Sequence, residues 1–213
     1  MFKAVLWDFG GVITSSPFEA FNRYEQDNGL PLDFIRGINA TNPETNAWAQ
    51  LESSEISVDE FNVKFADEAE SQGHRVNGKD VLDLLSGDVR PEMVAALKRI
   101  KQSQKVGCIT NNVNTGQGPG MAKSSRKASE VADIMAEFDV VMESSKIGIR
   151  KPDPRIYQMT CEHMSITPEE TIYLDDLGIN LKPARALGMT TIKVLSAEQA
   201  LTELEQHLGY ALR

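Results

Sequence analysis

The sequence predicts an α/β protein with a Rossmann-like parallel sheet flanked by helices and with a small inserted helical cap. From Arg90 onward, short apolar runs alternate with segments of helical periodicity, and such alternation is typical of a parallel sheet with right-handed crossovers. Another strand lies within residues 1–14, and residues 15–89 hold few strand signals. We therefore expect a core formed by residues 1–14 and 90–213, interrupted by a helical segment.

The elements of the core follow one another in a regular order. The first strand is the run from Lys3 to Asp8, which is too short for a helix. Ser196 with Gln199 fits a capping box, Pro168 suits the first turn of a helix, and Gly188 is placed to end one. Further strands are expected at 105–110, 139–142, 171–175 and 190–194, and helices at 92–102, about 121–136, 154–164, 180–187 and from Ala197 onward.

Residues 15–89 are expected to form helices. Phe18 and Phe21 have helical spacing, and Ser57-x-x-Glu60 fits a capping box at a helix start. The aromatic side chains of this segment are predicted to form its own core. Contact with a substrate is the alternative, and Trp48 is its strongest candidate because the residues before it are polar.

The first strand ends in a carboxylate followed by two glycines. Asp8 comes after the apolar run, and Gly10 and Gly11 follow at once. Open α/β sheets bind their ligands beyond the carboxyl ends of their strands, and glycine allows the backbone to turn sharply and approach a ligand closely. A loop cap is the alternative role for this aspartate.

The same pattern recurs in later strands, which favours a site over a loop cap. Thr110 and Asn111 follow the strand at 105–110, and Asp175 and Asp176 end the strand at 171–175. Lys151 stands between them and is held by the proline that follows it. If the strands are parallel, these groups meet at one edge of the sheet.

Phosphoryl transfer is the chemistry that such a set suits. Carboxylate and backbone oxygens are ligands that Mg²⁺ prefers, and this ion would act as a Lewis acid at a phosphoryl group. A hydroxyl and an ammonium group would stabilise the remaining phosphoryl oxygens. An aspartate nucleophile is one form of covalent catalysis.

These four segments resemble, in order and spacing along essentially the whole chain, the haloacid dehalogenase superfamily of phosphohydrolases. Within it, the chain is most similar to the N-terminal phosphatase domain of soluble epoxide hydrolases and related sugar-phosphate phosphatases, through Glu143–Tyr157 and Tyr173–Gly188. The resemblance implies a Mg²⁺-dependent phosphatase for a small organic phosphate, with a cap that closes over the site and selects the substrate.

The resemblance also implies a role for each residue of the catalytic set. Asp8 would be the nucleophile that forms an aspartyl-phosphate, and Lys151 would hold nucleophile and phosphate together. Thr110, with Asn111 beside it, would bind the phosphate.

The implied magnesium site contains a departure from the family pattern. Asp8 and Asp176 would be the main side-chain ligands, with Asp175 bonded nearby or ligating through water, and Gly10 would contribute its backbone carbonyl. Most relatives carry a second aspartate at the position of Gly10, where it acts as the acid and base. A positioned acid or base contributes about 10²–10⁴-fold, so activity is expected to be slow. Some related sugar-phosphate phosphatases also carry glycine here. A good leaving group or a carboxylate from the cap would reduce the loss.

Three functions are alternatives to a phosphatase. A weakened member of the family would bind a phosphorylated ligand or a protein partner, and Gly10 is the feature that favours this. A phosphomutase stays open. A dehalogenase is disfavoured, because Asp175 and Asp176 would repel each other unless a cation lay between them. Substrate and oligomeric state do not follow from the sequence, although the polar stretch 39–55 favours a sugar phosphate over a lipid phosphate.

Composition and charge indicate which kinds of partner and which cellular compartment to expect. The 213 residues carry a formal net charge of −9, which disfavours binding to nucleic acid. The basic segment 123–127 is expected to be a solvated helix face. No apolar run could span a membrane and no signal peptide is evident. Two cysteines, Cys108 and Cys161, indicate reduced thiols and a cytoplasmic location.

Several other features were weighed and assigned structural roles. Residues 73–80 nearly fit a phosphate-binding P-loop but carry an aspartate where a hydroxyl is required. The three histidines are scattered without metal-ligand spacing. Asp153 is expected to be a helix N-cap, Asn180 either supports the carboxylates or starts a helix, and residues 116–120 are expected to be a loop.

Overall fold

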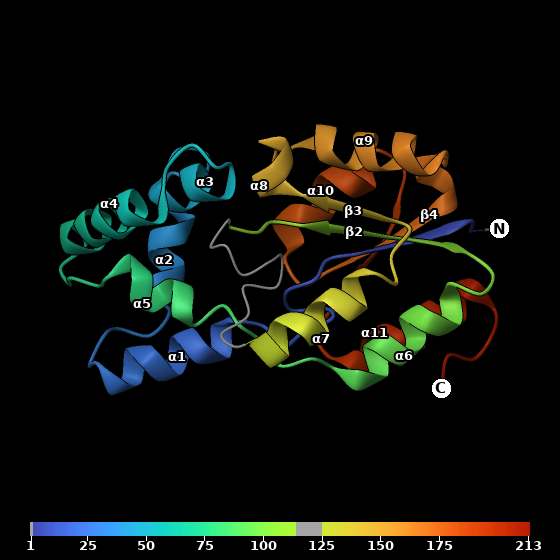
Figure 1. Cartoon of the computed structure of the whole chain (residues 1–213), viewed down its shortest axis with the longest axis horizontal. Coiled ribbons are helices and arrows are strands. Elements are labelled where there is room, and N and C mark those ends of the chain that lie inside the picture. The colour runs from blue at the N-terminus through green and yellow to red at the C-terminus, as the bar shows by residue number, and fades with distance from the viewer. Residues whose placement is uncertain (1, 114–124) are drawn as a thin grey trace.

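The computed structural model describes residues 2–113 and 125–213, and it confirms the α/β fold (Figure 1). Within these residues, strands form a single sheet in the order β3-β2-β1-β4-β5, and every neighbouring pair is parallel. The strands are β1 (Ala4–Trp7), β2 (Lys105–Thr110), β3 (Val140–Glu143), β4 (Thr171–Asp175) and β5 (Thr190–Lys193). The chain order reverses between β1 and β4, and open α/β sheets bind ligands at such a switch point.

Helices cover both faces of the sheet (Figure 1). One face carries α6 (Pro91–Ile100), α7 (Ser125–Met135) and α11 (Ala197–Leu208), and the other carries α8 (Ser144–Ile147), α9 (Pro154–Met164) and α10 (Gly178–Ala186). Successive side chains of β1 point to opposite faces. Val5 and Trp7 therefore join the first hydrophobic cluster, and Leu6 joins the second. Because both faces are covered, the strand is apolar throughout.

The inserted segment is helical, as predicted. Its helices are α1 (Phe18–Asp27), α2 (Phe34–Ala40), α3 (Ala47–Glu52), α4 (Val58–Ser71) and α5 (Gly78–Asp83). They lie beyond the carboxyl ends of the strands (Figure 1) and pack around a hydrophobic cluster of their own. Trp48 packs edge-on against Phe61 with ring centroids 5.5 Å apart, so it belongs to this packing. Val113, which follows β2, joins the same cluster.

The chain leaves the sheet and returns to it at one place. Thr14 forms an antiparallel bridge with Val89, and the Arg90 N–H donates to the carbonyl of Ile13 over 2.9 Å. These pairings lie at the predicted limits of the insertion. A Cβ atom on Gly87 would approach the carbonyl oxygen of Ser15 to 2.4 Å, so the two connecting segments are in close contact.

Most predicted elements agree with the structure to within two residues at their described ends, and the main differences are these. Pro168 lies in a three-residue 3-10 turn rather than an α-helix, because β4 begins at Thr171 directly after it. Helix α10 begins at Gly178, two residues before its predicted start. The four-residue helix α8 was not predicted. The strand expected at 139–142 is shifted by one residue, to Val140–Glu143.

Several local predictions are confirmed, and others lie outside the described residues. Capping boxes are formed at Ser57 and Ser196, and Gly188 has the positive φ of +105° that suits a helix end. The loop expected at 116–120, the first residues of the helix expected at about 121–136 and the start of the basic segment fall in 114–124. Among the described residues, no helix combines the length and apolar character needed to cross a membrane.

Candidate active site

Carboxylates from two neighbouring strands lie side by side at the switch point of the sheet. Asp8 follows β1, and its N–H donates to the carbonyl of Leu174 in β4 over 2.8 Å. This pairing brings Asp8 next to Asp175, as expected for parallel strands. Carboxylate oxygens of Asp8, Asp175 and Asp176 all lie within 4.8 Å of one another.

Lys151 joins the ends of the two strands. Its Nζ lies 2.8 Å from Asp8 Oδ1 and 2.9 Å from Asp175 Oδ2. The residue is 1% exposed, so little water screens these contacts. Burial alone would lower the pKa of Lys151, but the negative charges of Asp175 and Asp8 hold it well above its ordinary value. The ammonium group therefore stays charged.

Negative charge in this cluster exceeds positive charge. Burial raises the pKa of Asp8, and the positive charge of Lys151 lowers it. The negative charges of Asp175 and Asp176 raise it further, so the pKa of Asp8 lies well above its ordinary value. Burial and the charge of Asp175 raise the pKa of Asp176 to about 6. Three carboxylates thus share one ammonium group, which is a favourable electrostatic setting for a divalent cation.

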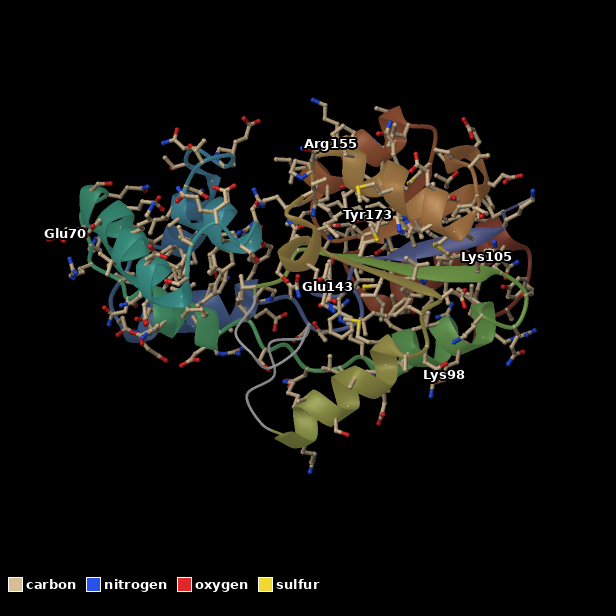
Figure 2. All side chains as sticks on the ribbon, turned by 45° about the horizontal axis from the view of Figure 1, so that its top comes forward. Glu70, Lys98, Lys105, Glu143, Arg155 and Tyr173 are labelled. Atoms are coloured by element: carbon tan, nitrogen blue, oxygen red, sulfur yellow. The ribbon has the colours of Figure 1, made fainter. Side chains whose placement is uncertain are left out.

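Asp175 is held by several donors. Both of its oxygens accept from Asn180 Nδ2 over 3.1 Å, and the N–H of Leu177 donates to Oδ1 over 2.8 Å. The hydroxyl of Tyr173 donates to Oδ2 over 2.5 Å; Figure 2 shows this tyrosine in the interior of the molecule. The structure thus favours the first of the two roles considered for Asn180. The part played by Tyr173 was not predicted, because a tyrosine within a strand gives no sign of its partner.

Asp176 lies against the turn that follows β1. The hydroxyl of Ser16 donates to its Oδ2 over 3.2 Å. A Cβ atom on Gly11 would lie 2.2 Å from the same oxygen, and Gly11 has a φ of +76°. Glycine is therefore required at position 11 both by its conformation and by this close approach. The contact with Ser16 was also missed from the sequence.

Thr110 ends β2, and Asn111, which follows it, contacts the lysine. Thr110 is buried, with 3% of its surface exposed. The side chain of Asn111 bonds to the backbone of Lys151: Oδ1 accepts from the lysine N–H over 2.8 Å, and Nδ2 donates to the lysine carbonyl over 3.0 Å. Since its amide is occupied, Asn111 could bind a phosphate only through its own backbone N–H.

Gly10, two residues after Asp8, has room for a side-chain atom among the described residues. Apart from its chain neighbours, a Cβ atom built on it would meet no atom of residues 2–113 or 125–213 within 4 Å. No other Asp, Glu, His or Cys among the described residues joins the group formed by Asp8, Asp175 and Asp176. Position 10 itself therefore carries no acidic side chain, and the described residues add no fourth member to this carboxylate group.

The other features weighed in the sequence have structural roles. Asp153 caps α9 by accepting from the N–H of Arg155 over 2.9 Å, as predicted. His74 and His207 pack edge-on against phenylalanine rings, and His163 bonds to the carbonyl of Met159. The region 73–80 contains the start of α5 and no preceding strand, so it lacks the structure of a P-loop.

The donor set fits a magnesium ion. Mg²⁺ prefers oxygen ligands from one or two carboxylates and retains several waters. Asp8 and Asp176 present carboxylates, whereas the oxygens of Asp175 are occupied by protein donors. Because three carboxylates face one ammonium group, a magnesium ion would also balance the remaining negative charge.

Comparison with known proteins identifies the family. Residues 2–188 match the haloacid dehalogenase-like hydrolases. The chain belongs to this family of hydrolases. The match includes Asp8, Thr110, Lys151 and Asp176.

Family members that are similar over nearly the whole chain include parts of longer proteins. Acyl-CoA dehydrogenase family member 10 of Mus musculus is 34% identical over 99% of the chain and 20% of its own length. Bifunctional epoxide hydrolase 2 of Sus scrofa is 30% identical over 99% of the chain and 39% of its own length. The chain thus spans between a fifth and two fifths of these relatives, and the resemblance to epoxide hydrolases is confirmed.

Other members of the family are close to the chain in length. A phosphatase of Mycobacterium tuberculosis is 32% identical over 88% of the chain and 84% of its own length. A family enzyme of Bacteroides thetaiotaomicron, crystallised with magnesium and inorganic phosphate, superposes with a TM-score of 0.64 and 21% identity. The superposition covers 96% of the chain and 99% of that enzyme, which supports the fold assignment.

Proposed function

We propose that this hydrolase is a Mg²⁺-dependent phosphatase that acts on a small phosphate monoester through an aspartyl-phosphate on Asp8. The observation that carries the proposal is the position of Lys151 Nζ, which lies within 2.9 Å of both Asp8 and Asp175. An ammonium group held beside a carboxylate nucleophile can also bind a phosphoryl oxygen. Similarity to a phosphatase of comparable length supports the same activity.

In the proposed reaction, Asp8 attacks the phosphorus atom of the ester. A bond forms between an Asp8 oxygen and phosphorus while the bond to the leaving oxygen breaks. Water then attacks phosphorus, which releases inorganic phosphate and restores the carboxylate. Lys151, the hydroxyl of Thr110 and the backbone N–H of Asn111 would stabilise the phosphoryl oxygens through both steps.

Asp8, Asp176 and the carbonyl of Gly10 would hold the magnesium ion, with Asp175 supporting them through its hydrogen bonds. When bound, Mg²⁺ supplies Lewis acidity and offsets the repulsion between the nucleophile and the anionic substrate. The clustering of the three aspartates supports this assignment.

Residues 15–89 would serve as the cap over this site. Helices α1–α5 lie beyond the carboxyl ends of the strands, and Ser16 in the first connecting segment contacts Asp176. A lid in this position would exclude bulk water during phosphoryl transfer. Together with residues 1–14 and 90–213 as the core, this is the domain arrangement that we propose.

A second candidate is a weakened member of the family that binds a phosphorylated ligand. Gly10 favours it, because glycine at this position supplies no acid to protonate a leaving group. Intact Asp8, Lys151 and Asp176 favour catalysis. The two candidates differ in whether phosphate is released.

The test is phosphate release from a panel of sugar, lipid, nucleotide, acyl and nitrophenyl phosphates, with and without Mg²⁺. We expect Mg²⁺-dependent release that Asp8→Asn abolishes and that Asp27→Asn, a change at an exposed carboxylate of α1, leaves intact. Full activity in Asp8→Asn would overturn the nucleophile assignment. Binding of phosphate esters without release from any of them would favour the second candidate. Transfer of phosphate to a substrate hydroxyl would indicate a phosphomutase.

A further inference from the structure

Arg150, the residue before Lys151, reaches out of the core and into the helical insertion. Its Nε and Nη2 lie 2.7 and 2.6 Å from Glu52 Oε2 at the end of α3, and its Nη1 donates to the carbonyl of Pro43 over 2.8 Å. The side chains of Glu52 and Arg150 are 9% and 21% exposed. All of these contacts join the loop that carries Lys151 to the inserted helices.

The same Glu52 oxygen contacts the residue that clamps Lys151. Asn111 Nδ2 donates to Glu52 Oε2 over 3.3 Å and also to the carbonyl of Lys151 over 3.0 Å. The Lys151 N–H in turn donates to Asn111 Oδ1 over 2.8 Å. The Glu52 carboxylate therefore contacts both Arg150, which precedes Lys151, and Asn111, whose side chain bonds to the N–H and the carbonyl of Lys151.

We propose that Glu52 is a positioning residue that couples docking of α3 to the placement of Lys151. This inference rests on the proposed function, since it assigns the lysine a part in catalysis. When α3 is docked, Glu52 holds the Arg150 guanidinium and the Asn111 amide, and these fix the backbone that carries the ammonium group. When α3 is displaced, both groups lose this acceptor.

The geometry of the lysine makes this coupling matter. Its Nζ lies within 2.9 Å of carboxylates on two different strands, while its backbone lies in the segment between α8 and α9, outside any strand. The hydrogen bonds to Asn111 therefore hold the Lys151 backbone, which has no strand-to-strand hydrogen bonds of its own to the described residues. A displacement of about 1 Å in a catalytic group can cost about 10²-fold in rate.

Glu52 could instead replace the acid that is missing at Gly10, but its contacts argue against this. Its Oε2 accepts from Arg150 and Asn111 together. A carboxylate fixed by these donors links two parts of the fold and is not free to reach a leaving oxygen.

The experiment compares Glu52→Ala, Glu52→Gln and Ser54→Ala in the full chain. Gln keeps an oxygen acceptor for Arg150 and Asn111, so it should recover most of what Ala loses. Ser54→Ala is the matched control, because it removes a contact of the same α3 end with the core, the 2.8 Å bond to the Ser145 carbonyl. That bond involves none of Arg150, Asn111 and Lys151. The measurements are kcat and KM for nitrophenyl phosphate with Mg²⁺, and amide hydrogen exchange at Lys151 without substrate.

For Glu52→Ala we expect kcat to fall by up to about 10²-fold with little change in KM, together with faster exchange of the Lys151 amide. Ser54→Ala should change neither measurement. Native kcat and unchanged exchange in folded Glu52→Ala would overturn the inference. If Glu52→Ala does not fold, Glu52→Asp decides: it keeps the charge but shortens the reach, so folded protein with native kcat and exchange would overturn the proposal equally.

Failure of the proposed function would look different. If the native chain released phosphate from no ester, the phosphatase assignment would fail, while exchange at the Lys151 amide would still show whether α3 is coupled to that loop. If the native chain were active and the Glu52 variants matched it in both measurements, the phosphatase assignment would stand and the positioning role of Glu52 would be wrong.

Discussion

Gly11 and Asp176 are in direct contact: a Cβ atom at position 11 would lie 2.2 Å from Asp176 Oδ2, far inside the contact distance of two atoms. A Cβ atom at the neighbouring Gly10 would have no such contact with the part of the chain that the structure describes. The two adjacent glycines therefore have different roles. Gly11 allows the Asp176 carboxylate to approach the turn after β1, whereas Gly10 is not required by any such approach among the described residues.

Gly11→Ala should damage both stability and metal binding. A non-glycine residue at a positive φ costs roughly 1–2 kcal/mol in free energy of unfolding, and the added methyl group must displace Asp176. We expect lower stability in urea and weaker Mg²⁺ binding by calorimetry. Gly10→Ala is the control, since its methyl group has room and its stability should stay close to native. Equal effects of the two changes would contradict the distinction between the two glycines.

Gly10→Asp should increase phosphatase activity toward substrates with poor leaving groups. A Cβ atom at position 10 has room among the described residues, and a positioned acid contributes about 10²–10⁴-fold. The increase should be large for an alkyl phosphate and small for nitrophenyl phosphate, whose leaving group needs little protonation. The measurement is kcat/KM for the two esters in both proteins.

The outcome for Gly10→Asp is informative in either direction. Gly10→Asn has nearly the same size but carries no acid, so it should give no increase. If Gly10→Asp gave no increase on the alkyl ester while the protein remained folded, protonation of the leaving group would not be the limiting step.

The clustering of Asp8 with Asp175 could be predicted from the sequence because parallel strands bring their carboxyl ends to one edge. The link from Glu52 to Arg150 could not, since the two residues are 98 positions apart and neither lies in a repeating pattern. Helix α8 is only four residues long, too short to show periodicity. Local hydrogen bonding could be predicted at Asp153 and Ser57. For Asn180 the bond to a carboxylate was one of two roles considered, whereas the partner of Tyr173 depends on tertiary packing.

Lys151→Met should strongly destabilise the protein. The change leaves the Asp8 and Asp175 carboxylates without the ammonium group that both contact, and removing one partner of a buried ion pair costs about 3–5 kcal/mol. Denaturation in urea without Mg²⁺ measures the loss. Lys98→Met is the control: its side chain is 58% exposed, lies at the surface in Figure 2 and pairs with Glu137 at 3.5 Å, so we expect a change of about 0–1 kcal/mol. Similar losses in both variants would show that Lys151 has no special part in the stability of the core.

Magnesium should stabilise the folded chain, and chelation should reverse the effect. An ion that binds only the folded state adds about 2.7 kcal/mol to the free energy of unfolding at one hundred times its Kd. Asp8, Asp175 and Asp176 lie close enough to supply this binding. We expect Tm to rise with Mg²⁺ and to return with EDTA in the native chain and in Asp27→Asn. In Asp176→Asn the rise should disappear, because this change removes a metal carboxylate while keeping a side chain of nearly the same size. An undiminished rise in folded Asp176→Asn would place the bound ion elsewhere, and the assignment of Asp176 as a ligand would be wrong.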